Sequence, residues 1–143
     1  DMYDSLFLCD YHDRSEFVFD RENRPFGVAE QFAANHSSEP KVLEYKHSFD
    51  SLVDDFDKEM KFETHIDLVV CWTAGNKFKS RYFFSSLLVG DEGTSREVFG
   101  ATHQVFRDGS MSRVFEVIVL SDLLQFIRDP DSEVARQRTL YGD

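Results

Sequence analysis

The segment from residue 41 to residue 72 constrains the fold of this chain most, because it predicts a strand, a helix and a second strand. KVLEYK, residues 41–46, has the alternation of a β-strand, which places Glu44 and Lys46 on the same face. IDLVVCW, residues 66–72, is almost continuously apolar, which is typical of a strand covered on both faces of a sheet. The residues between them are numerous enough for a crossover, so we expect the two strands to be parallel.

Between these two strands, apolar side chains recur with helical spacing. We predict a helix from Ser48, a suitable N-cap, to about Met60, with one apolar stripe made of Phe49, Leu52, Val53, Phe56 and Met60. Its outer face is charged, and we interpret this face as solvated rather than as a metal cluster: Asp54, Asp55, Asp57, Lys58 and Glu59.

The rest of the chain predicts further strands and two helices. A Pro25 start and apolar spacing indicate a short helix over Phe26–Asn35, and SDLLQFIRDP (121–130) indicates a helix with Ser121 as N-cap and Leu123, Leu124 and Ile127 inward. The expected strands are SLFLCDY (5–11), EFVFD (16–20), RYFFSSLLV (81–89), and THQVFR (102–107) paired with MSRVFEVIVL (111–120) around an Asp108-Gly109 turn. The fold class is therefore α/β, or mixed α+β, with a central mixed sheet of five or more strands flanked by helices.

Length and composition set broad limits on the protein. The 143 residues fit one domain, which we expect over residues 1–130, followed by a frayed polar tail at 131–143. The net charge of −11 weighs against non-specific binding of nucleic acid, which depends on Lys and Arg. No apolar run approaches the ~20 residues of a membrane span, so we expect a cytoplasmic protein without a membrane partner. Because the chain starts at Asp1 and not at Met, we expect either an excised piece of a longer protein or a processed form.

Two residue types that often bind metals give weak signals here. Cys9 and Cys71 lie far apart in apolar windows without a CxxC pattern, and we interpret them as free thiols. The histidines His12, His36 and His103 are interpreted as surface or hydrogen-bonded core residues rather than as ligands.

The charges within the strand–helix–strand segment indicate a functional site. An unpaired charge inside a sheet is costly, yet Glu44 and Lys46 lie on the first strand, and Asp67, preceded by His65, begins the second. Carboxylates that hold Mg²⁺ beside a lysine are suited to phosphodiester hydrolysis. Two other interpretations remain open: an ion pair of Glu44 and Lys46 on an exposed sheet face, and an Asp67 that only caps a helix or begins a strand.

LEYKHSFDSL and THIDLVVCW together resemble the core of PD-(D/E)xK restriction-endonuclease-like domains. More narrowly, they resemble the variant fused to GHKL-type (gyrase, Hsp90 and histidine-kinase-like) ATPases or to bacterial defence proteins. The resemblance implies a Mg²⁺-dependent endonuclease acting on DNA, with other domains of the same protein, such as an ATPase, as partners. It implies catalytic roles for Glu44, Lys46 and Asp67, with Glu44 and Asp67 also binding the metal.

The sequence departs from this family in one respect. The family supplies a first metal-binding Asp on a strand directly before the E-x-K strand, whereas here the predicted helix Phe26–Asn35 intervenes. Asp20, which closes EFVFD, is the best substitute and our third predicted metal ligand. The alternative function is an inactive nuclease-fold scaffold or a protein-interaction domain.

One compact basic cluster is a candidate contact for nucleic acid. Lys77, Lys79 and Arg81 lie close together after the second strand, and we interpret them as DNA-binding residues. An ordinary solvated loop is the alternative interpretation.

Overall fold

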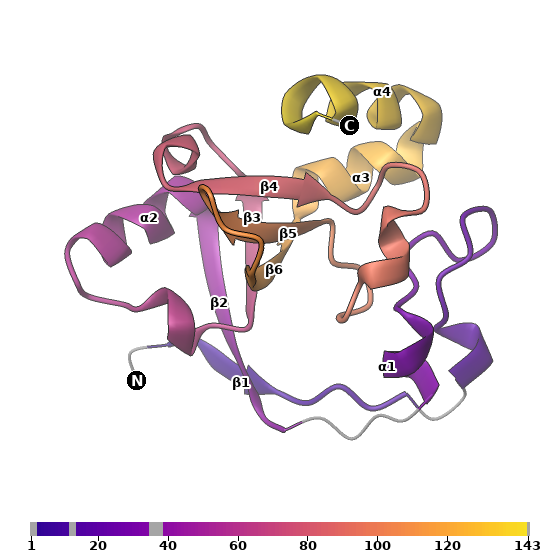
Figure 1. The fold of residues 1–143 in the computed structure, drawn as a ribbon, viewed down its shortest axis with the longest axis horizontal. Coiled ribbons are helices and arrows are strands. Elements are labelled where there is room, and N and C mark those ends of the chain that lie inside the picture. The colour runs from indigo at the N-terminus through magenta and orange to yellow at the C-terminus, as the bar shows by residue number, and fades with distance from the viewer. Residues whose placement is uncertain (1–2, 12–13, 35–38, 143) are drawn as a thin grey trace.

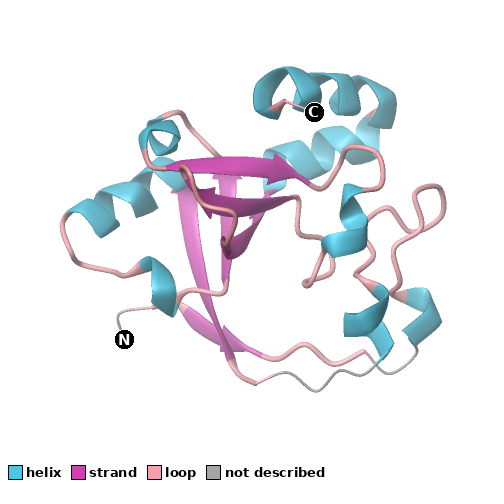
Figure 2. Ribbon diagram, in the orientation of Figure 1, coloured by secondary structure: helices cyan, strands magenta, loops and turns pink. Residues whose placement is uncertain are grey.

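The computed structural model describes residues 3–11, 14–34 and 39–142. Within these residues, six strands form one mixed sheet in the order β1-β2-β3-β6-β5-β4 (Figures 1 and 2). The strands β2, β3 and β6 are parallel to one another, and the other neighbouring pairs are antiparallel. The bounds of the strands are β1 Ser5–Phe7, β2 Lys41–Ser48, β3 Leu68–Thr73, β4 Tyr82–Ser86, β5 His103–Arg107 and β6 Arg113–Val119.

Helices pack around this sheet. In Figure 1, α2 lies to the left of β2, α1 lies on the opposite side, and α3 and α4 lie together at the upper right. The α-helices are α1 Glu30–Ala34, α2 Phe49–Asp57, α3 Leu120–Arg128 and α4 Pro130–Tyr141, and the short 3-10 helices are Arg14–Glu16, Glu63–His65, Lys77–Ser80 and Glu92–Ser95. The predicted class, a mixed sheet flanked by helices, is confirmed.

The predicted strand–helix–strand unit is present. β2 and β3 are parallel, with Leu43 opposite Leu68 and Lys46 opposite Cys71. Ser48 caps α2 as predicted, because its hydroxyl accepts a hydrogen bond of 3.2 Å from the backbone N–H of Asp50. The predicted Asp108-Gly109 hairpin also forms between β5 and β6, and Gly109 takes the positive φ of 77° that favours glycine.

The apolar stripe of α2 builds the main core. Its members Phe49, Leu52, Val53 and Phe56 are buried against Val69, Cys71, Phe84, Val105, Phe115 and Val117 of the sheet. Met60 was predicted to belong to this stripe, but it is 56% exposed. The helix ends at Asp57, and Glu59 then takes a φ of 57°, which turns the chain away from the sheet before Met60.

We expect Phe56→Ala to lower the free energy of unfolding by about 3–5 kcal/mol, because it removes a buried aromatic side chain. Chemical denaturation measures this loss. The control is Met60→Ala, which removes an exposed side chain and should change the stability by less than about 0.5 kcal/mol. A loss below about 1 kcal/mol for Phe56→Ala would contradict the packing of α2.

The opposite face of the sheet carries a second, smaller core. Leu43 and Leu68 pack there with Leu87, Val98 and Ala101, which belong to the connection between β4 and β5. This connection therefore covers the face that α2 leaves free.

The segment before β2 differs from the prediction. Residues 16–20 form no strand, since only the isolated bridges Val18–Val28 and Asp20–Arg24 occur there. The chain folds back on itself at Arg21–Pro25 and satisfies its backbone locally rather than in the sheet. The predicted helix Phe26–Asn35 is reduced to Glu30–Ala34, and Asn35, His12 and His36 lie outside the described residues.

The C-terminal part also corrects the prediction. α3 begins at Leu120 with Val119 as N-cap, not Ser121, and Leu124 and Ile127 are 51% and 60% exposed. The buried residues of α3 are instead Asp122 and Phe126. Asp122 is buried because it faces α4, where Arg136 and Gln137 donate hydrogen bonds to its carboxylate. The expected frayed tail is instead the helix α4, which Asp129 caps by accepting a bond of 3.2 Å from the Ser132 N–H.

Within the described residues, no helix combines the length and the apolar character needed to cross a membrane.

Candidate functional site

Glu44 lies at the centre of a charged cluster on β2. Its side chain is completely buried, so an exposed ion pair on a solvated sheet face is wrong for this residue. Its Oε1 accepts a hydrogen bond of 3.2 Å from the backbone N–H of Asp4, and its Oε2 accepts one from Nζ of Lys61. A buried carboxylate in this setting requires such partners.

Asp4 supplies a second carboxylate beside Glu44. In the antiparallel β1–β2 pair Ser5 lies opposite Leu43, so Asp4, one residue earlier, reaches the position opposite Glu44. The Asp4 side chain is exposed, and its Oδ2 accepts a hydrogen bond of 2.8 Å from the backbone N–H of Tyr45. The fold thus places an acid directly before the strand that neighbours the E-x-K strand.

The two carboxyl groups influence each other's ionisation. Burial raises the pKa of Glu44; the Lys61 ammonium opposes this rise, and the Asp4 carboxyl adds to it. The pKa of Asp4 is lowered, chiefly by the bond from Tyr45 and next by its interaction with Glu44. The Asp4 and Glu44 carboxyl groups therefore interact with each other directly.

Lys46 and Lys61 are joined through an acid on α2. Nζ of Lys46 lies 2.8 Å from Oδ2 of Asp55, and Nζ of Lys61 lies 3.7 Å from the same oxygen. Burial lowers the pKa of Lys61, but its bond with Glu44 outweighs this effect and raises the pKa above its usual range. Lys46 and Lys61 therefore both pair with carboxylates around β2.

Asp67 lies at the start of β3 and serves the backbone there. Its exposed side chain accepts a hydrogen bond of 2.7 Å from the backbone N–H of Val42, which fixes the beginning of β3 against β2. Nδ1 of His65, two residues earlier, lies 3.0 Å from the hydroxyl oxygen of Tyr3. The contacts of the described residues join neither side chain to Glu44, so Asp67 acts in the structure as a residue that begins a strand.

Asp20 lies in a turn away from β2. Its Oδ1 accepts hydrogen bonds of 3.0 Å and 2.9 Å from the backbone N–H groups of Glu22 and Asn23. These hydrogen bonds lower the pKa of Asp20, and the bond from the Asn23 N–H has the largest effect. Among the described contacts none links Asp20 to Glu44, and Asp4, rather than Asp20, is the carboxylate beside Glu44.

The predicted basic cluster is largely paired with the acidic face of α2. Lys77 lies 3.8 Å from Asp54, and Arg81 forms an ion pair with Asp57. These partners are exposed, so each pair is worth little energetically. Lys79 instead lines a cavity of about 230 Å³ at the carboxyl end of β3, together with Arg136 of α4.

The donor set limits how a metal is held. Within residues 3–11, 14–34 and 39–142, no group of three or more His, Cys, Asp and Glu side chains is arranged to hold a metal ion. A divalent ion at Glu44 would therefore have two protein carboxylates and complete its shell with water or phosphate oxygens.

A buried polar network lies at the junction of the sheet with α3 and α4. The sequence predicts only that His103 is a surface or hydrogen-bonded core residue, and it does not predict the other members of this network. Oε1 of Gln137 lies 2.8 Å from Nε2 of His103, and Nε2 of Gln137 donates to Asp122 at 2.9 Å and Glu133 at 2.7 Å. Nδ1 of His103 lies 2.7 Å from the hydroxyl of Thr102. The network anchors α4 to the sheet. Its members lie far apart in the sequence, so no local sequence pattern predicts their contacts.

The fully buried His103 should make stability depend on acid. Burial lowers its pKa, so the unfolded chain binds this proton more readily and stability falls as pH drops below about 6.5. We expect His103→Gln to lose this contribution, about 1.4 kcal/mol per pH unit, in urea unfolding between pH 7.5 and about 5. An unchanged slope in His103→Gln would contradict the assignment.

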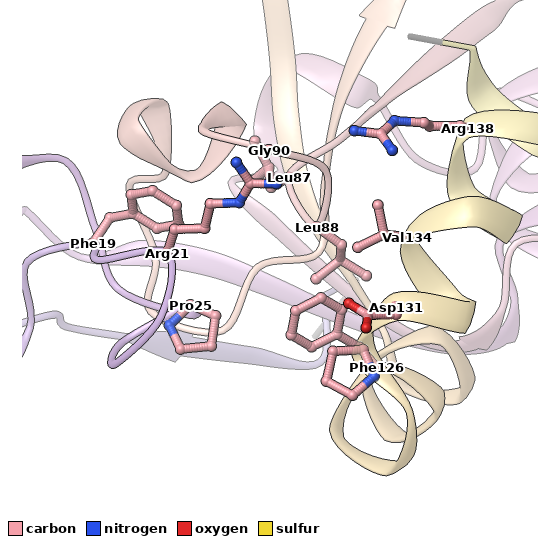
Figure 3. A pocket seen from close by; sticks show the side chains of 11 residues that line it. Phe19, Arg21, Pro25, Leu87, Leu88, Gly90, Phe126, Asp131, Val134 and Arg138 are labelled. Atoms are coloured by element: carbon pink, nitrogen blue, oxygen red, sulfur yellow. The ribbon is translucent and has the colours of Figure 1, made fainter.

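A cavity of about 360 Å³ lies between the turn after Phe19, the segment after β4, and α3 and α4 (Figure 3). Leu87, Leu88 and Phe126 give it apolar walls, and Arg21 and Arg138 add charge. None of the predicted catalytic or metal-binding residues lines it, so it is separate from the Glu44 cluster.

Comparison of the chain with protein-family models, curated proteins and solved structures gives no match.

Proposed function

We propose that this chain is a nuclease-like domain that hydrolyses phosphodiester bonds of DNA with the help of a divalent metal ion. The supporting observation is the position of Asp4, which stands beside Glu44 across the β1–β2 pair. Lys46 follows two residues along β2 on the same face. Two carboxylates and one lysine, on one strand and directly before its neighbour, are close to the set that the PD-(D/E)xK resemblance leads us to expect.

The residues around Glu44 fit Mg²⁺ or Mn²⁺. Magnesium prefers oxygen ligands, commonly takes only one or two carboxylates from the protein, and keeps several waters. Asp4 and Glu44 would supply these two carboxylates, and the exposed side chain of Asp4 leaves one side open to water and phosphate. When bound, the ion would activate water and offset the charge that develops at the phosphate.

Lys46 would bind the substrate phosphate and stabilise its negative charge in the transition state. Its ammonium is now 2.8 Å from Asp55, with 23% of its side chain exposed. Because this ion pair is partly solvated, a phosphate oxygen can replace Asp55 as the partner of Lys46 at modest cost.

The acidic balance of the chain bears on how DNA reaches this site. The net charge of −11 leaves few cations to neutralise phosphates, and two of the three predicted DNA-binding residues are paired with α2. We therefore infer weak, salt-sensitive DNA binding by this domain alone. Another domain of the same protein, such as an ATPase, would deliver the substrate.

A second candidate function is an inactive nuclease-fold scaffold or protein-interaction domain. The observation in its favour is that Glu44 and Lys46 already have charged partners: Lys61 pairs with Glu44 and Asp55 pairs with Lys46. In a scaffold these pairs would be permanent, and no divalent ion would bind.

Calorimetric titration with Mn²⁺ separates these two functions. We expect wild-type protein to bind the ion, and Asp4→Asn and Glu44→Gln each to lose at least about tenfold in affinity, since each removes a ligand. The matched control Asp20→Asn should bind as wild type does. Unchanged affinity in Asp4→Asn would exclude Asp4 as a ligand, and a wild type that binds nothing at millimolar Mn²⁺ would leave only the scaffold.

A further inference from the structure

Lys61 is placed differently from a lysine that serves a substrate. Its ammonium bonds Oε2 of the fully buried Glu44, and only 14% of its side chain is exposed. The other carboxylate oxygen of Glu44 accepts the backbone N–H of Asp4. Among the described residues, Lys61 is therefore the only side-chain cation bonded to Glu44, and it bonds the carboxylate oxygen that the Asp4 N–H does not use.

The turn after α2 directs Lys61 to this position. Glu59 takes a φ of 57°, and the backbone N–H groups of Met60 and Lys61 then bond the carbonyl oxygen of Asp55 at 2.9 Å and 3.4 Å. The next residue, Phe62, donates its backbone N–H to the hydroxyl of Tyr3 at 3.2 Å. These hydrogen bonds fix the backbone before and after Lys61, and the conformation of the turn places the Lys61 side chain next to Glu44.

Asp55 offers Lys61 a second partner. Its Oδ2 lies 3.7 Å from Nζ of Lys61 and 2.8 Å from Nζ of Lys46. A lysine that leaves Glu44 would thus keep an acid nearby, and a lysine side chain changes rotamer readily. Exchange of Lys61 between Glu44 and Asp55 requires no change in the backbone.

We infer that Lys61 is a built-in competitor of the divalent ion: its ammonium neutralises Glu44 while the site is empty of metal and must leave Glu44 for the metal to bind. This inference rests on the proposed function, because it assumes that Asp4 and Glu44 bind the ion. The ammonium stabilises the buried carboxylate in the metal-free protein, and it weakens metal affinity by the free energy needed to displace it.

The test compares Lys61→Met with wild type in two measurements. In calorimetry with Mn²⁺ we expect Lys61→Met to bind at least about tenfold more tightly, because no cation has to be displaced. In thermal unfolding we expect Lys61→Met to melt lower than wild type in EDTA, since Glu44 loses its partner, and to gain more from Mn²⁺ than wild type does.

Two further variants make the comparison specific. Lys58→Met removes an exposed lysine near the end of α2, so it reports the general effect of one lost positive charge and should bind Mn²⁺ as wild type does. Lys61→Gln, which keeps a hydrogen-bond donor, replaces Lys61→Met if the latter fails to fold, and it should also bind more tightly than wild type.

The outcomes distinguish this inference from the proposed function. Equal Mn²⁺ affinity in wild type, Lys61→Met and Lys61→Gln would overturn the competitor role and leave the metal site in place. Absence of Mn²⁺ binding in all of these proteins would overturn both. Both the competitor role and the metal site would be supported if the Lys61 variants bind Mn²⁺ more tightly than wild type and the double variant Lys61→Met/Glu44→Gln does not.

Discussion

Lys46→Ala is expected to abolish metal-dependent cleavage of DNA while the protein stays folded. The lysine ammonium would stabilise the charge on the phosphate in the transition state, and loss of one such group costs about 10²–10³ in rate. The stability should change little, because the Lys46–Asp55 pair is partly exposed and worth at most about 1 kcal/mol. A loss of activity without a loss of structure separates this role from one in packing.

The measurement is Mn²⁺-dependent nicking of supercoiled DNA at low salt, with circular dichroism as the check of folding. The control Lys58→Ala removes an exposed lysine of the neighbouring segment and should cleave at the wild-type rate. Cleavage by Lys46→Ala at the wild-type rate would remove this lysine from the reaction.

The second large effect concerns Arg96, which no part of the proposed chemistry uses. Its fully buried guanidinium donates to four backbone carbonyl groups, those of Ala101 at 2.7 Å, Pro25 at 2.9 Å, Gly27 at 2.7 Å and Leu87 at 3.0 Å. Burial lowers the pKa of Arg96 to about 10, so it remains charged at neutral pH. One side chain thus ties the segment before α1 to the connection between β4 and β5.

We expect Arg96→Met to lower the free energy of unfolding by more than about 4 kcal/mol, because each buried carbonyl left without a donor costs about 1–3 kcal/mol. Such a loss approaches the whole stability of a small domain, so the variant should be largely unfolded in circular dichroism at 37 °C. Arg128→Met, which changes an exposed arginine at the end of α3, is the control and should melt near wild type. A wild-type melting curve for Arg96→Met would contradict this role.

The elements that local patterns specify were predictable from the sequence. Alternation gave β2, a continuous apolar run gave β3, and the spacing of Phe49, Leu52 and Phe56 gave α2. Each of these signals lies within one element, where side-chain period and burial agree. The end of α2 was missed because the left-handed turn at Glu59 is set by the backbone, not by the apolar stripe.

The candidate site was only half predictable, since its remaining parts come from distant segments. Glu44 and Lys46 stand on one strand and were visible as a pair, but Asp4 joins them through a β1–β2 pairing of residues about forty positions apart. β1 has three residues, too few for a clear pattern, and Asp20 was chosen from a stretch that forms a turn instead. Lys61 follows the charged face of α2 that was interpreted as solvated, and no sequence pattern singled it out.

The C-terminal helices show the same limit. The polar sequence of α4 predicts a frayed tail, yet Gln137 is completely buried between His103, Asp122 and Glu133. Polar residues enter a core when every donor and acceptor finds a partner, and such partners are defined only by the tertiary structure.

The position of the bound ion is the most direct test of the proposed site. Mn²⁺ broadens the NMR signals of nuclei close to it, so substoichiometric Mn²⁺ added to isotope-labelled protein reports where the ion binds. We expect the backbone signals of Asp4, Glu44 and Tyr45 to broaden first, and those of Asp20 and its turn to stay sharp. Broadening centred on the acidic face of α2, or no selective broadening at all, would contradict a metal site at Asp4 and Glu44.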